Sequence, residues 1–276
     1  MHRIRHSLLG AVALVATAHP AFAQIRAQAE PIRSTVEAHG TEPVARDVAI
    51  TNLGDAPVVV NVRWSDWTID EFGEMALLPP GSLPTSLVDG VRFEPRTFSL
   101  AAGETGRIHV VLSLPGDGPD TRWGVLLSEI RPAVVANPAR GPRAIAELGS
   151  TFYLTRVPSA RLEPELIGLD LLPTAGDSLT VRARVRNAGQ RHLYVSGEVS
   201  LADSAGAQVR AGTLPTGVVL PGRVREFTWM CDARLPMGAY TVTATLDTGQ
   251  PELLVGEAKL TIPVTPLPAV PVATRR

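Results

Sequence analysis

Short runs in which apolar and polar residues alternate recur along this chain, and glycine or proline closes most of them. The clearest run contains Ile108, Val110, Leu112 and Leu114, and a period of two is the spacing that buries one face of a β-strand. The 24 glycines and 24 prolines disfavour long helices and favour tight turns. The pattern therefore predicts an all-β protein built from many short strands.

Two immunoglobulin-like β-sandwich domains in tandem are predicted from the length of 276 residues and the spacing of the turns. The expected bounds are residues 24–158 for the first domain and 159–262 for the second. A weak internal repeat supports this division. Residues 52–54 read Asn-Leu-Gly and residues 187–189 read Asn-Ala-Gly, each after a predicted strand, and Gly103 and Gly222 each precede another strand. Two copies of one sandwich plan explain this best, and chance similarity of turn residues is the alternative.

The first 23 residues are typical of a secretory signal peptide. Arg3 and Arg5 precede an apolar run from Leu8 to Ala18 that is too short to span a bilayer, and residues 21–23 match the small-x-small cleavage pattern. We therefore expect a soluble, periplasmic protein that begins at Gln24 and has no membrane span, with secretion or the cell surface as the alternative location. Residues 263–276 contain four prolines and are predicted to form a flexible tail.

Charge and cysteine content exclude some classes of partner and of stabilising bond. The net charge is −1 and charged residues make up only 19%, so neither nucleic acid nor an anionic membrane is an expected partner. Cys231 is the only cysteine, so no internal disulfide can form. Its apolar neighbours favour a buried hydrophobic role over that of a reactive thiol.

No pattern of residues points to an enzyme, a cofactor or a metal. His39, His109 and His192 are the only histidines after the signal peptide, and none has the spacing of a zinc site. His109 is expected on the exposed face of a strand. The sequence also lacks the G-x-S-x-G motif of hydrolases, and it lacks the S-x-x-K motif of β-lactamases because its only lysine is Lys259.

One charged and aromatic segment could be taken for a site. Asp66, Asp70 and Glu71 lie near two tryptophans and resemble a pair of catalytic carboxylates, but acidic residues in such a connection are usually solvated. Trp64, Trp67 and Phe72 could form a platform for sugar, although tryptophan is common in sandwich cores. We expect at most one of these aromatic side chains to be exposed, and residues 70–92 to form a long connection.

Four segments follow one another in the first domain: Val48–Asn52 with Val58–Trp67, Phe93–Gly103, Thr121–Pro132 and Phe152–Pro158. Their order resembles the N-terminal immunoglobulin-like domain of the periplasmic pilus chaperones (PapD-like), and the last segment is similar to that family's Phe-Tyr-Arg-Pro link. The second domain resembles a generic immunoglobulin-like module.

The resemblance implies two sandwiches arranged as a boomerang and a client subunit held by β-augmentation, in which an edge strand of the chaperone pairs with the client. The lending strand would be Ala144–Leu154, with partner-binding residues Ile145, Leu148 and Phe152, together with Arg33 of the first strand. A proline at Leu148 would block such an edge if its amide points outward. The family's carboxylate-binding lysine has no counterpart, since residues 149–151 read Gly-Ser-Thr.

The leading functional expectation is therefore a non-enzymatic periplasmic chaperone-like protein. It would assist assembly of a pilus or other secreted or surface structure by pairing with a secreted subunit. The alternative is a non-catalytic structural or adhesion module with immunoglobulin-like domains. The sequence does not name the client, and it leaves open whether the free protein forms a homodimer through the same edge.

Overall fold

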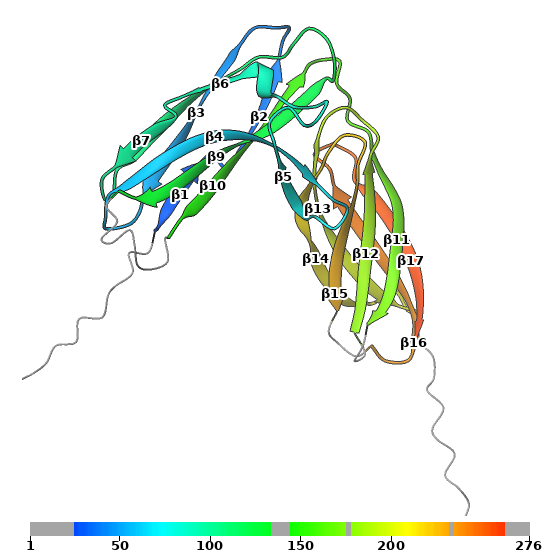
Figure 1. Ribbon diagram of the computed structural model, residues 1–276. Coiled ribbons are helices and arrows are strands. Elements are labelled where there is room, and N and C mark those ends of the chain that lie inside the picture. The colour runs from blue at the N-terminus through cyan, green and yellow to red at the C-terminus, as the bar shows by residue number, and fades with distance from the viewer. Residues whose placement is uncertain (1–24, 134–143, 175–177, 232–234, 263–276) are drawn as a thin grey trace, which may run out of the picture.

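The computed structural model describes residues 25–133, 144–174, 178–231 and 235–262. These residues form two β-sandwiches that meet at an angle, so that the molecule has the shape of an arch (Figure 1). The predicted fold class, all-β with two immunoglobulin-like sandwiches in tandem, is confirmed. No helix in the described ranges is long and apolar enough to cross a membrane.

The first sandwich packs a four-stranded sheet, in the order β1-β3-β8-β6, against a six-stranded sheet, in the order β2-β10-β9-β4-β5 with β7 also paired to β4. One 3-10 turn, η1, covers Val88–Gly90. The strands are β1 (Ala27–Glu30), β2 (Arg33–Ala38), β3 (Val44–Asn52), β4 (Val58–Ile69), β5 (Met75–Leu78), β6 (Val91–Glu94), β7 (Thr97–Leu100), β8 (Thr105–Leu112), β9 (Thr121–Pro132) and β10 (Ala146–Arg156).

The second sandwich packs a three-stranded sheet, in the order β11-β12-β15, against a four-stranded sheet, in the order β14-β13-β16-β17. Its strands are β11 (Pro164–Thr174), β12 (Ser178–Asn187), β13 (Leu193–Asp203), β14 (Gln208–Val219), β15 (Val224–Cys231), β16 (Gly238–Asp247) and β17 (Leu254–Ile262). Each sandwich has its own apolar core. Val48, Ile50 and Ile108 are fully buried in the first, and Val181 and Val199 in the second.

The internal repeat predicted from the sequence is present in the hydrogen bonds. In the first sandwich, the main-chain N–H of Gly103 donates to the carbonyl oxygen of Asn52, and the Asn52 side chain accepts from the N–H of Gly54. In the second, the N–H of Gly222 donates to the carbonyl oxygen of Asn187, at the same 2.9 Å. Both asparagines are buried, and each joins the end of one strand to the turn before another.

Residues 70–92 are not the continuous connection that the sequence predicts. The chain turns at Asp70, whose carboxylate accepts from the N–H groups of Phe72 and Glu74. Gly73 follows with a positive φ of 93°, and β5 then pairs back onto the end of β4. Sequence patterning missed this hairpin because the four residues of β5 are all apolar and do not alternate.

Several smaller predictions can also be compared with the structure. Cys231 is buried, as expected, and His109 lies on the exposed face of β8, paired with Asp47. The last strand of the first domain begins at Ala146 and ends at Arg156, two residues later at each end than predicted. The signal peptide at residues 1–23 and the tail at 263–276 lie outside the described residues, and the predicted domain bounds stay predictions.

Candidate functional site

Half of β10 is an open sheet edge. One side of this strand pairs with β9 from Ala146 to Thr155, whereas the other side pairs with β2 only from Thr151 to Arg156. Within the described chain, residues 146–150 therefore have no strand beside them on the β2 side. An unpaired edge of this kind offers main-chain donors and acceptors to another chain.

The direction of the free main-chain groups follows from one hydrogen bond. The N–H of Thr151 donates to the carbonyl oxygen of Ile32, just before β2, at 3.0 Å. Main-chain groups alternate in direction along a strand, so those of Glu147 and Gly149 point to the same side as Thr151 and face the open edge. The main-chain groups of Leu148 and Ser150 point toward β9. Glu147 and Gly149 are both exposed, so a partner strand could reach them.

The side chains on the inner face of this edge are apolar and only half-buried. Ala146 and Leu148 pack against the core of the first sandwich without being fully covered. Ile25, just before β1, and Ala27, its first residue, are half-buried beside the same core. Because β1 is itself the edge of the opposite sheet, both sheets end on this side of the sandwich. A strand added to β10 would bring side chains that cover Leu148.

The four residues predicted from the resemblance have different positions. Ile145 is 52% exposed immediately before β10, and Leu148 is half-buried at the open edge. Phe152 is fully buried and lies where β2 and β9 flank β10 on both sides, so the prediction that it contacts a partner is corrected to a core role. The alternation that exposes Gly149 turns Phe152 inward against Trp64, at a centroid distance of 5.9 Å.

Arg33 lies at the inner end of the open edge. Its Cα is the register partner of Thr151, the first residue of β10 that β2 covers. The guanidinium carbon of Arg33 lies 3.8 Å from the ring centroid of Tyr194 in the second sandwich, which is a cation–π contact. Among the described residues, no carboxylate lies within ion-pair distance of Arg33. A positive charge therefore stands where a strand paired along residues 146–150 would end.

An aromatic joint connects the two sandwiches beside Arg33. The rings of Tyr153 and His192 stack with centroids 3.9 Å apart, and the Tyr194 hydroxyl donates to the Tyr153 hydroxyl at 3.0 Å. Thr35 Oγ1 and His192 Nε2 form a hydrogen bond of 3.3 Å. Burial, with smaller contributions from Arg191 and Arg33, lowers the pKa of His192 to about 4. The imidazole is therefore neutral at pH 7.

Two further contacts strengthen this joint. Trp67, Trp123 and Tyr153 of the first sandwich form one buried cluster with Val218 and Leu220 of the second. At the tip of the β4–β5 hairpin, the carbonyl oxygen of Glu71 accepts from the main-chain N–H of Glu226 at 2.7 Å. The sequence pattern did not predict this joint. The one sequence feature that points to it is the aromatic character of Tyr153, His192 and Tyr194.

The charged and aromatic segment at the end of β4 gives no catalytic arrangement. Asp66 is fully buried, which corrects the expectation that it is solvated, and its carboxylate accepts from the Ser86 hydroxyl and the Leu83 N–H. Trp64 and Trp67 are buried and Phe72 is 67% exposed, so one aromatic residue of the three is exposed, as predicted. No group of three or more metal-binding side chains occurs in the described ranges.

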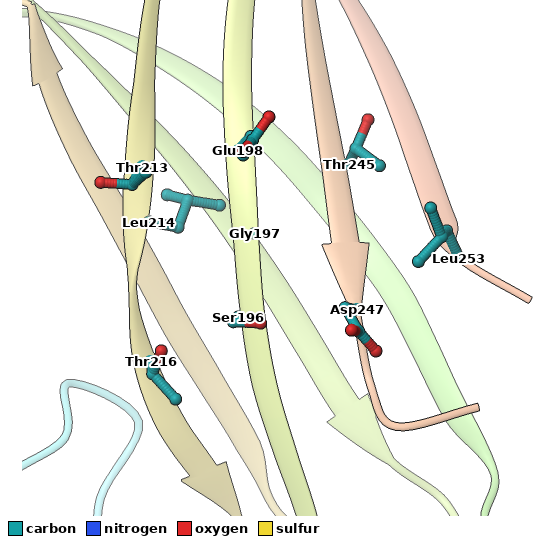
Figure 2. A pocket seen from close by; sticks show the side chains of 9 residues that line it. All are labelled: Ser196, Gly197, Glu198, Thr213, Leu214, Thr216, Thr245, Asp247 and Leu253. Carbon is teal, nitrogen blue, oxygen red and sulfur yellow. The ribbon is translucent and has the colours of Figure 1, made fainter. Parts of the chain in front are cut away.

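A surface depression lies away from this edge, on the outer face of the second sandwich. Figure 2 shows its lining on β14, β13 and β16, with Leu253 just before β17. Its volume is about 590 Å³, and it is lined by Ser196, Gly197, Glu198, Thr213, Leu214, Thr216, Thr245, Asp247 and Leu253. These nine residues include hydroxyls and two carboxylates but no histidine, lysine or cysteine.

No protein-family model and no curated protein matches the chain. Solved structures similar to it include the YadV chaperone, at 11% identity over 85% of this chain and 99% of that one, with a TM-score of 0.45. The CupB2 chaperone of Pseudomonas aeruginosa is 13% identical over 84% and 100% of the two chains, with a TM-score of 0.43. The CsuC–CsuE chaperone–tip subunit complex of Acinetobacter baumannii is 15% identical over 73% of this chain and 89% of that one, with a TM-score of 0.42. All three are structures of chaperones or of a chaperone complex.

Proposed function

We propose that this protein is a periplasmic chaperone-like protein that assists the assembly of a pilus or another secreted or surface structure. It would hold a client subunit by pairing one strand of that subunit with residues 146–150 of β10. The observation that carries the proposal is the open edge of β10, where exposed main-chain groups lie beside the half-buried side chain of Leu148.

The chemistry of the edge defines the client. The partner must supply an extended strand with free main-chain groups, because Glu147 and Gly149 offer two donors and two acceptors along one line. It should also supply an apolar side chain to cover Leu148. Arg33 would then meet a negative group at the end of the strand, either an acidic side chain or a terminal carboxylate. A subunit that lacks one strand of its own sandwich has these properties.

Affinity purification of the tagged protein from periplasmic extract, followed by mass spectrometry, tests the proposal. Three forms should be compared: the unchanged protein, Glu147→Pro and Glu147→Ala. Proline removes an N–H that faces the open edge, whereas alanine keeps this N–H and removes only the side chain that pairs with Arg63. We expect a stoichiometric secreted subunit with the unchanged protein and with Glu147→Ala, and its loss with Glu147→Pro.

Two results would contradict the proposal. A partner that binds all three forms equally would show that strand pairing at residue 147 is not the binding mode. Absence of any partner would favour a structural module with immunoglobulin-like domains. If only a homodimer were recovered and Glu147→Pro abolished it, the same edge would pair with a second copy of the chain.

A further inference from the structure

The second sandwich has an open edge of its own at β17. This strand is the last in its sheet and, in the described part of the chain, pairs only with β16. Strand β11 of the opposite sheet lies beside it (Figure 1), with Leu166 against Gly256. Its residues alternate between half-buried and exposed over its whole length. Val255, Glu257, Lys259 and Thr261 form the exposed face, with Val255 59% exposed. Main-chain groups alternate in direction along a strand, so those of every second residue of β17 face away from β16, with no strand hydrogen-bonded to them in the described chain.

The sequence of this edge is complementary to itself in the antiparallel direction. If a second copy of β17 is placed antiparallel with Ala258 opposite Ala258, Glu257 lies opposite Lys259 of the other copy. The same register puts Val255 opposite Thr261 and Leu254 opposite Ile262. Directly opposed side chains lie about 5 Å apart at Cβ, so opposite charges there attract. A two-fold axis repeats each pair, which gives two Glu–Lys contacts in each dimer.

The charges also select this register against its neighbours. A continuous sheet keeps exposed residues opposite exposed residues, so the register can shift only in steps that preserve this alternation. Centring the axis on residue 257 would place two glutamates opposite each other, and centring it on residue 259 would place two lysines opposite each other. Within the described chain, neither Glu257 nor Lys259 has an ion-pair partner within 4 Å. Lys259 is also the only lysine of the chain, whose other 25 basic residues are arginines.

We propose that two copies of this protein associate through β17, antiparallel about Ala258, to form one continuous eight-stranded sheet across the dimer. The inner side chains support this arrangement. Leu254 and Leu260 are half-buried against the core of the second sandwich, and a second strand would cover their open side. The dimer leaves β10 free in both copies, so it is independent of client binding. An edge of a single strand buries little area, and we expect a dissociation constant of about 10–100 μM.

Charge reversal tests the register directly. Glu257→Lys and Lys259→Glu each turn both attractive pairs into repulsive ones, and each variant should dimerise at least about tenfold more weakly by sedimentation analysis between about 1 μM and 1 mM. The double variant Glu257→Lys/Lys259→Glu restores the attraction and should dimerise like the unchanged protein. An equimolar mixture of the two single variants should form a heterodimer, because every opposed pair in it again carries opposite charges.

The single lysine allows a second measurement. A carbodiimide joins an amine to a carboxylate in direct contact, so it should crosslink Lys259 of one copy to Glu257 of the other. In a mixture of ¹⁴N- and ¹⁵N-labelled protein, mass spectrometry should find crosslinked peptides that contain both isotopes. Lys259→Arg keeps the charge and the dimer but removes the reactive amine, so it should abolish this crosslink without changing sedimentation.

Three results would overturn the proposal. The first is a monomer throughout the concentration range. The second is a dimer in which the single and double charge variants behave alike. The third is a dimer that Glu147→Pro abolishes, since that would place the interface at β10. Circular dichroism of each variant shows whether it folds, and because both side chains are exposed on an edge, we expect unchanged spectra.

Discussion

The N–H of Thr151 donates to the carbonyl oxygen of Ile32, and this one hydrogen bond determines which main-chain groups of β10 are open to a partner. It places the groups of Glu147 and Gly149 on the free side and those of Leu148 on the β9 side. The edge is therefore a main-chain feature, and its inner face is formed mainly by Leu148. A proline scan can distinguish these two sides of the strand.

Proline at position 148 should destabilise the first sandwich, whereas proline at 147 should not. Leu148→Pro removes an N–H that pairs with β9 and leaves an acceptor there unsatisfied, so we expect a loss of at least about 2 kcal/mol in the free energy of unfolding. Glu147→Pro removes only an N–H on the open side. Urea unfolding of both variants measures the difference, and equal destabilisation would contradict the orientation of the strand.

The joint between the sandwiches should weaken in acid. His192 has an ordinary pKa of 6.5 that is lowered to about 4 in the folded protein, so the unfolded chain binds a proton more readily. The neutral ring contributes its full stabilisation above pH 6.5, and this stabilisation is lost as the pH falls from 6.5 to 4. The loss in the free energy of unfolding is at most about 3 kcal/mol. In His192→Phe, which keeps the stack on Tyr153, the free energy of unfolding should depend much less on pH over this range.

The exposed His109 provides the control for this measurement. His109→Gln removes a histidine that lies outside the joint, so the fall in stability between pH 6.5 and 4 should persist in that variant. Arg33 and Arg191 face His192 from β2 and from the residue before it, and both oppose its protonation. If His192→Phe kept the full pH dependence, the joint would not be its source.

Close packing of Trp64 on β9 should make Gly124 intolerant of a side chain. A Cβ at Gly124 would lie 2.3 Å from the Trp64 ring, which is buried and cannot move away. Gly124→Ala should therefore cost about 1–3 kcal/mol of stability. Gly116→Ala is the matched control, because nothing lies within 4 Å of its Cβ position. Equal thermal midpoints for the two variants would be incompatible with this packing.

The two repeated asparagines should have equal structural importance. Asn52→Ala leaves the carbonyl of Ala101 and the N–H of Gly54 without their side-chain partner, and Asn187→Ala does the same to Val219 and Gly189. We expect each substitution to reduce the stability of its own sandwich by about 2–3 kcal/mol. Calorimetry checks the values, and a loss below about 0.5 kcal/mol at either site would contradict the equivalence of the two turns.

The sequence predicted the sandwiches well because alternation and turn residues are local signals. The run from Ile108 to Leu114 and the turns at Asn52 and Asn187 are examples. It did not predict the burial of Asp66 or the stack of Tyr153 on His192, because these depend on contacts between distant segments. Phe152 was assigned to the partner surface because the sequence shows where β10 runs, but not how far β2 covers it.

Amide hydrogen exchange on β10, with and without the captured secreted subunit, tests the central claim most directly. Strand pairing predicts that the amides of Glu147 and Gly149 exchange rapidly in the free protein and become protected in the complex. The amide of Leu148, already bonded toward β9, should be protected in both. If Glu147 and Gly149 continued to exchange rapidly in the complex, the client would be held elsewhere and the proposed function of this edge would be contradicted.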